Sequence, residues 1–65
     1  STVQVEVNDD IPYQVNLLNL EGKLLYSESS LSGNTVLDLS DYEDGVYIIE
    51  VINDKGIIRK QLVKN

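Results

Sequence analysis

A strict alternation of apolar and polar residues, in segments too short for helices, is the feature that most constrains the fold. Across residues 2–8 (TVQVEVN), Val3, Val5 and Val7 share one face and the polar residues between them share the other. Successive side chains of a β-strand point to opposite faces, which gives this period of two. No stretch of the 65 residues has helical spacing over a useful length. The chain is therefore predicted to be built from strands.

Five further segments are rich in the residue types that strands favour, and each is bounded by turn residues. They are residues 13–20, 23–28, 35–40, 46–53 and 57–63. The residues expected to face the core are Tyr13, Val15, Leu17, Leu37, Leu39 and Tyr47. Segment 46–53 is apolar on nearly both faces, which favours a central strand packed from both sides. Six short strands at this spacing predict one all-β domain over residues 1–65, a small antiparallel immunoglobulin-like β-sandwich of about six to seven strands.

Turn residues separate these segments. Asp9, Asp10 and Pro12 are expected to end the first strand, because carboxylates favour turns and proline fixes φ. Gly22, in the sequence LEGKL, predicts a tight hairpin, since glycine takes positive φ without steric cost. Residues 27–34 (SESSLSGN) are the longest polar stretch and are predicted to be a loop that crosses between the sheets.

Composition excludes several classes of function. The chain has neither histidine nor cysteine, so it lacks the commonest general base, the commonest transition-metal ligand and any thiol nucleophile. Its net charge of −6 argues against nucleic acid as a partner. A sandwich of this size leaves little volume for a catalytic cleft. We therefore expect no enzyme activity and no cofactor.

The charge is divided unevenly along the chain. All eleven carboxylates lie in residues 1–54, where Lys23 is the single base, whereas residues 55–65 carry four bases and no acid. This basic end could meet an anionic partner, or it could be a solvated strand whose lysines protect an open edge. Self-association through an open strand edge also stays open. No signal peptide or membrane-spanning run is visible in the sequence.

Residues 39–51 (LSDYEDGVYIIEV) place four carboxylates around the start of the central strand. An EF-hand loop does not fit, because Gly45 at its sixth position puts Tyr42 and Val51 where oxygen ligands are needed. No metal site is therefore predicted, although a looser calcium site within Asp41–Asp44 stays open. The structural interpretation is a turn, with Ser40 as the N-cap of a single helical turn.

The order of motifs resembles a known family. The motifs are VNLLNLEGKLLYS, then NTVLDLSDYEDGVYIIEV, then KGIIRKQLVKN. Together they resemble the type A C-terminal sorting domain of cargo proteins of the type IX secretion system of Bacteroidota, over roughly residues 13–65. The sequence departs from the family in two ways. Tyr42 stands where the family prefers leucine, and in place of the family's YPNP element only residues 9–12 (DDIP) are at all similar.

The resemblance implies a secretion signal rather than an activity. It implies a cargo domain upstream, transit through the periplasm, recognition by the outer-membrane translocon, and cleavage by a sortase-like peptidase with attachment of the cargo to the cell surface. The candidate recognition residues that it implies are Gly22, Lys23, Gly45, Tyr47, Arg59, Lys60, Leu62, Val63 and Lys64. Deletion of Val63 to Asn65 is expected to leave the fold largely intact and to abolish export. The alternative function is a non-catalytic adhesion, carbohydrate-binding or spacer module of a secreted protein.

Overall fold

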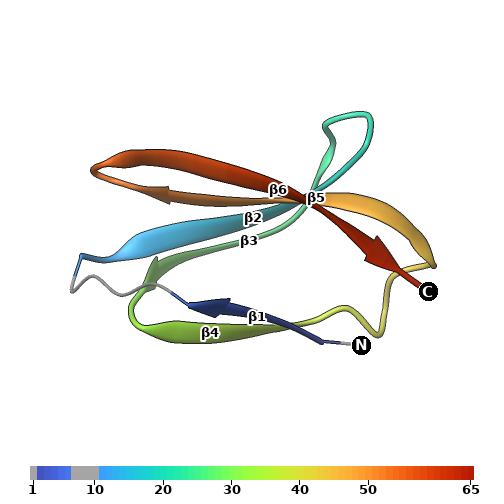
Figure 1. The fold of residues 1–65 in the computed structure, drawn as a ribbon, viewed down its shortest axis with the longest axis horizontal. Helices are drawn as coiled ribbons and strands as arrows, with labels where there is room; N and C mark the ends of the chain where they lie inside the picture. The colour runs from blue at the N-terminus through green and yellow to red at the C-terminus, as the bar shows by residue number, and fades with distance from the viewer. Residues whose placement is uncertain (1, 7–10) are drawn as a thin grey trace.

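Two antiparallel sheets face each other in the structure, a computed structural model that describes residues 2–6 and 11–65. The described residues form six strands: β1 (Thr2–Glu6), β2 (Tyr13–Asn19), β3 (Leu24–Leu31), β4 (Asn34–Asp38), β5 (Gly45–Asn53) and β6 (Gly56–Lys64). One sheet has the order β3-β2-β5-β6, and the other consists of β1 and β4. Figure 1 shows the larger sheet lying above the β1–β4 pair. The prediction of a small all-β sandwich is confirmed.

The core lies between the two sheets. One cluster joins Val5, Tyr13, Val15, Leu37 and Ile49, all of which are buried. A second cluster joins Leu17, Leu39 and Tyr47. Every residue that the alternation predicted to face inward among the described strands is therefore in the core, except that Val3 is only half-buried. Val7, Asp9 and Asp10 lie outside the described residues.

Strand β5 is central, as predicted, because it pairs with β2 on one side and β6 on the other. Its second apolar face differs from the prediction. Ile48 and Ile52 are half-buried and lie on the face of β5 opposite to that of the core residue Ile49. Figure 1 shows no described element over that face. Their burial comes from neighbouring side chains within the same sheet rather than from a third layer.

The polar stretch 27–34 is not a loop, and this prediction was wrong. Strand β3 continues to Leu31, which pairs with Tyr13. An irregularity in the register between Tyr13 and Val15 inserts an extra residue on β3, where Ser30 has a φ of 58°. Because β3 is an edge strand whose side chains are mostly exposed, it needs few apolar residues to remain paired. Only Ser32 and Gly33 separate β3 from β4.

A row of polar side chains crosses the outer face of the larger sheet. Ser27, Asn16, Glu50 and Arg59 stand opposite one another on its four strands. The Ser27 hydroxyl donates to Asn16 Oδ1 (2.8 Å), Asn16 Nδ2 to Glu50 Oε1 (3.2 Å), and Arg59 Nε to Glu50 Oε2 (2.5 Å). Asn16 and Glu50 are only 9% and 7% exposed. Since a slip of register would leave these buried groups unpaired, the row favours the observed alignment.

Tyr13 ties the larger sheet to the start of β4. Its hydroxyl donates to the Gly33 carbonyl (2.7 Å) and is hydrogen-bonded to the Thr35 hydroxyl (2.6 Å). We expect Tyr13→Phe to lower the free energy of unfolding by about 1–2 kcal/mol, since it leaves these partners unpaired. Urea denaturation measures this change. The matched control is Tyr26→Phe, whose hydroxyl bonds the exposed Glu28 and whose loss should change little. Equal effects of the two variants would contradict this account.

The polar row predicts a pH dependence. Hydrogen bonds from Asn16 and then from Arg59 lower the pKa of Glu50 below its ordinary value of 4.5. A carboxyl whose pKa is lower in the folded state stabilises the fold above that value and loses this contribution as the pH falls through the folded pKa.

We therefore expect the fall in melting temperature between neutral pH and about pH 3 to be smaller for Glu50→Gln than for the unmodified chain. Circular dichroism at both pH values measures it. If the melting temperature of Glu50→Gln falls as much as that of the unmodified chain, Glu50 does not contribute to the pH dependence of stability.

Candidate functional site: the hairpin end of the sandwich

Most of the predicted recognition residues gather at one end of the sandwich. The β2–β3 hairpin, the turn before β5 and the end of β6 all lie at the right-hand end of Figure 1. Pairing connects them, because Asn19 at the base of the hairpin stands opposite Tyr47, which stands opposite Leu62. Gly45 stands opposite Lys64. We call this region the hairpin end, and its boundaries are residues 18–24, 38–48 and 62–64.

The hairpin is held by the side chain of Asn19. Its Oδ1 accepts hydrogen bonds from the backbone N–H groups of Glu21 (3.0 Å) and Lys23 (2.9 Å). Gly22 has a φ of 87°, which an L side chain rarely adopts, so the predicted role of glycine here is confirmed. The turn presents the exposed Lys23 at its tip.

The acidic turn is shaped by Asp38 rather than by Ser40. Asp38 Oδ1 accepts hydrogen bonds from the backbone N–H of Ser40 (2.9 Å) and from its hydroxyl (2.5 Å). The bond from the hydroxyl, followed by the one from the backbone, lowers the pKa of Asp38. The N–H of Tyr42 then donates to the Leu39 carbonyl (3.0 Å) and closes a tight turn. The predicted turn is present, but the helical turn capped by Ser40 is not formed, because Asp38 offers the competing hydrogen bonds.

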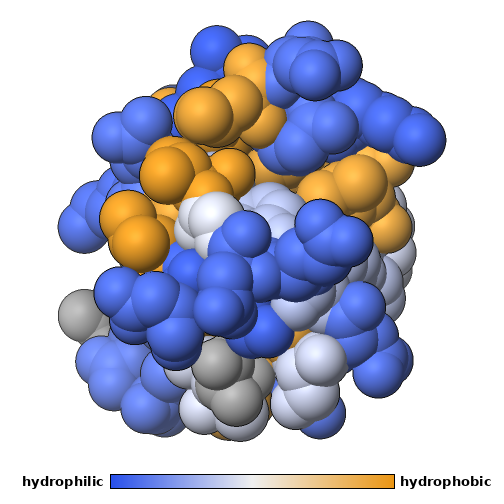
Figure 2. Space-filling model, turned by 90° about the vertical axis from the view of Figure 1, so that its right-hand side faces the viewer, coloured by the Kyte–Doolittle hydropathy of each residue, from blue (hydrophilic) through white to orange (hydrophobic). Residues whose placement is uncertain are grey.

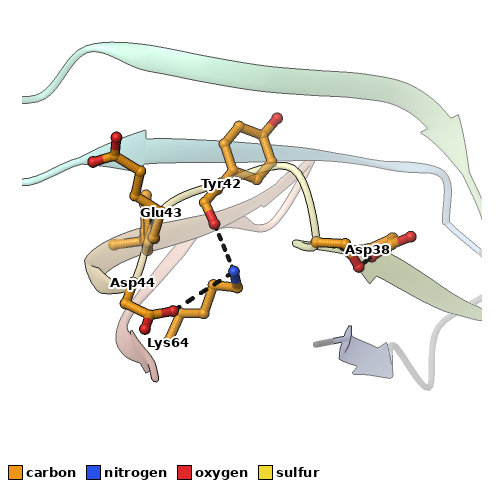
Figure 3. A network of polar contacts seen from close by, with 7 residues as sticks. Asp38, Tyr42, Glu43, Asp44 and Lys64 are labelled. Atoms are coloured by element: carbon orange, nitrogen blue, oxygen red, sulfur yellow. Dashed lines mark hydrogen bonds and ion pairs between the residues drawn. The ribbon is translucent and has the colours of Figure 1, made fainter.

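Lys64 holds this turn against the end of β6 (Figure 3). Its Nζ donates to the Tyr42 carbonyl (2.5 Å) and lies 3.8 Å from Asp44 Oδ1. The Lys64 side chain is only 12% exposed, whereas that of Asp44 is 73% exposed. A hydrogen bond from a buried ammonium is worth more than an ion pair in water, so the contact with the carbonyl dominates. Lys64 is therefore part of the fold at this end.

Tyr47 fixes the other side of the same turn. Its buried ring meets the Tyr42 ring edge to face, with the centroids 6.2 Å apart. Its hydroxyl donates to the Glu43 carbonyl. The Tyr42 ring thus supplies the apolar contact expected at this position, whereas its bond to Lys64 comes from the backbone carbonyl, which any residue would offer.

An apolar patch lies on the outer face of the larger sheet at the hairpin end. Leu24, Leu18 and Ile48 align across three strands. Val46 and Val63 stand opposite each other two residues further along, on the same face as Ile48. We call these five residues the outer patch. Val63 is 66% exposed, and Figure 2 shows hydrophobic surface gathered in the upper half of the view from this end.

The remaining two candidates lie away from this end. Arg59 stands at the middle of β6, where it pairs with Glu50 in the polar row. Lys60 stands opposite Ile49 and therefore on the inner face of the larger sheet, pointing the opposite way from Arg59. The basic end is thus not a single surface, because its cations divide between two faces of the strand.

The carboxylates of the acidic turn are not grouped as metal ligands in the structure. Over residues 2–6 and 11–65, no three acidic side chains are grouped so that they could hold a metal ion. In the same part of the chain, no helix has the length and apolar character that a membrane span requires.

Sequence reasoning missed Asn19 and Asp38, and a signal for both was present. Each is an Asn or Asp placed two residues before a backbone N–H that its side chain can bind, which is the pattern of an Asx turn. The buried role of Lys64 had no such signal, because it depends on which carbonyl the turn brings to the end of β6.

The contact of Lys64 generates a prediction about stability. Lys64→Met keeps the aliphatic stem and removes the ammonium, so the Tyr42 carbonyl loses its donor. We expect it to cost about 1–2 kcal/mol of unfolding free energy and to speed amide exchange in residues 39–44. Lys60→Met is the matched control, because no described residue binds Lys60, and it should stay within about 0.5 kcal/mol. Equal stability of both variants would contradict the role given to Lys64.

The chain was compared with known families, with curated proteins and with solved structures. The family model for the secretion system C-terminal sorting domain matches residues 1–65, which is the whole chain. Comparisons with curated proteins and with solved structures gave no match. Members of the matched family direct their cargo across the outer membrane, to the cell surface or the medium. The chain belongs to the secretion system C-terminal sorting domain family, and it is a sorting signal of the type IX secretion system.

Proposed function

We propose that the type IX outer-membrane translocon recognises the folded domain at its hairpin end, through the outer patch and the hairpin tip. The observation that carries this proposal is the contrast between Val63 and Lys64. Val63 is a valine with 66% of its surface exposed, and it stands opposite Val46 at the β6 edge of the outer patch, whereas the neighbouring Lys64 is bound to the turn. An exposed apolar side chain that extends an apolar patch is the kind of contact that carries binding energy when a partner covers it.

The other candidates take different parts in this proposal. Gly22 and Lys23 form the polar rim of the surface, with Lys23 offering an exposed charge. Tyr47 and Lys64 keep the turn in place, so that the patch is presented as one rigid surface. Gly45 begins the strand that carries Val46. Arg59 contributes through the polar row, which aligns the strands beneath the patch.

The cargo joined to this domain would cross the periplasm before it reaches the translocon, and a sortase-like peptidase would then remove the domain at the surface. The domain is the substrate in that step, and the catalysis belongs to the peptidase. The family is not known to be catalytic, which supports the view that this chain is no enzyme. The family match does not favour the alternative of an adhesion or carbohydrate-binding module.

Point substitutions test the proposal better than deletion of the last three residues. Such a deletion would remove the contact of Lys64 with the turn as well as Val63, so loss of export could follow from instability. In the test, residues 1–65 are fused to a periplasmically targeted reporter in a type IX-competent host, and the reporter outside the cell is measured. Val63→Asp is expected to lower export about tenfold or more, because it places a charge where the apolar contact would form.

Ile57→Asp is the matched control for this experiment. Ile57 is 56% exposed and lies on the same face of the same strand, at the opposite end. We expect export to be unchanged, and thermal melting of both purified domains should show equal stability. Normal export of Val63→Asp, or an equal loss for both variants at equal stability, would refute the outer patch as the recognised surface.

A further inference from the structure

The two sheets do not cover each other completely. Four strands of one sheet face only two of the other, so the inner face of β6 extends beyond the β1–β4 pair. Ile58 shows the consequence. It stands opposite Val51, on the face that points toward the core, and yet it is 62% exposed. An isoleucine on the inner face of a sandwich is normally buried, so this exposure marks an uncovered strip.

A groove of about 350 Å³ follows this strip between β1 and β6. Its apolar lining comes from β1 (Val3, Val5), β5 (Ile49, Val51) and β6 (Ile58, Leu62). The groove runs beside the edge of β1 that β4 does not occupy, because β4 is the only described partner of β1. The backbone N–H and C=O groups on such an edge are available to pair with another strand.

Lys60 stands in the middle of this groove. It lies on the inner face between Ile58 and Leu62, and no described residue forms a hydrogen bond or an ion pair with it. The other charged residue in the lining is Glu6, at the end of β1. A cation between apolar side chains is complementary to a segment in which a carboxylate is flanked by apolar side chains.

A second copy of this chain fits the strip less well. Each copy carries a net charge of −6, and a second copy that laid its own β6 antiparallel along this one, centred on Lys60, would set the two Lys60 side chains opposite each other. Like charges that stand opposite each other on paired strands are destabilising. The charge of Lys60 therefore opposes self-pairing and favours a different, acidic segment.

We propose that this groove receives an extended segment of a partner protein, which adds to the free edge of β1 and covers the inner face of β6. Apolar side chains of the segment pack on Ile58 and Leu62, and a carboxylate between them meets Lys60. The added strand makes a three-on-four sandwich. The inference rests on the proposed function, since it gives the chemistry of a second contact with the secretion machinery, on the face opposite the outer patch.

Two capped peptides serve as probes of the groove. In the first, threonine alternates with valine, glutamate and valine, so that the two valines and the glutamate share one face. The second has lysine in place of the glutamate. Each is titrated into the ¹⁵N-labelled chain, and amide shifts are followed. We expect the glutamate peptide to shift amides of residues 2–6 and 58–62 and to bind about three- to fivefold more tightly than the lysine peptide.

Charge reversal makes the test specific. In Lys60→Glu the preference should invert, so that the lysine peptide binds more tightly. In Lys23→Glu, which reverses an exposed cation outside the groove, the original preference should remain. The absence of shifts in both strands, or a preference that does not respond to Lys60→Glu, would overturn the proposal. A dimer that shifts the same amides without peptide would overturn it in favour of a second copy.

The result is separable from the proposed function, because peptide binding is measured without the secretion system. A chain that takes up neither peptide but is exported normally would remove the groove and leave the outer patch standing. A chain that binds the glutamate peptide but is not exported would leave the groove standing and remove the proposed function.

Discussion

The rest of the domain depends on one constraint, which is the burial of the inner face of β2 and β5 against the short β1–β4 pair. A chain of 65 residues buries only about 60% of the surface that its unfolded form exposes, so its stability margin is small. The two core clusters are built mainly from these four strands. Few apolar residues remain for the ends and edges, where side-chain hydrogen bonds hold the turns and align the strands instead.

This division explains how a sorting signal can be a folded object. At the hairpin end, Tyr47 and Lys64 bind carbonyl groups of the acidic turn, and Asn19 closes the hairpin. These contacts leave Val63 exposed beside its apolar neighbours. The acidic turn thus has a structural role, because it supplies the carbonyls that fix the end of β6. Its exposed carboxylates, such as Asp44, contribute mostly charge.

The alternation of residues predicted most of the fold, and the misses have physical causes. Tyr13, Val15 and Leu17 were predicted inward because each lies on a strand with one face toward the core. The prediction ended strand β3 too early, because an edge strand exposed to water needs no apolar pattern to remain paired. The carboxylate of Glu50 was not predicted to be buried, because its burial depends on Asn16 and Arg59, which only the pairing of three strands brings together.

The candidate site was predicted unevenly for a related reason. Gly22 is fixed by local backbone geometry, which a short sequence specifies. Lys64 was expected to be a docking charge, yet its environment is set by the carbonyl of Tyr42, 22 residues earlier in the chain. Lys60 and Arg59 are neighbours in sequence but face opposite sides of β6, so a basic stretch on a strand need not form one surface.

Export of a fused reporter tests the central claim most directly. A reporter with an ordinary periplasmic leader is joined to residues 1–65 and expressed in a type IX-competent host and in the same host without the translocon. If the chain is a type IX sorting signal, the reporter reaches the cell surface or medium only in the competent host. Reporter that stays in the periplasm of both hosts, while the domain is folded, would contradict the account.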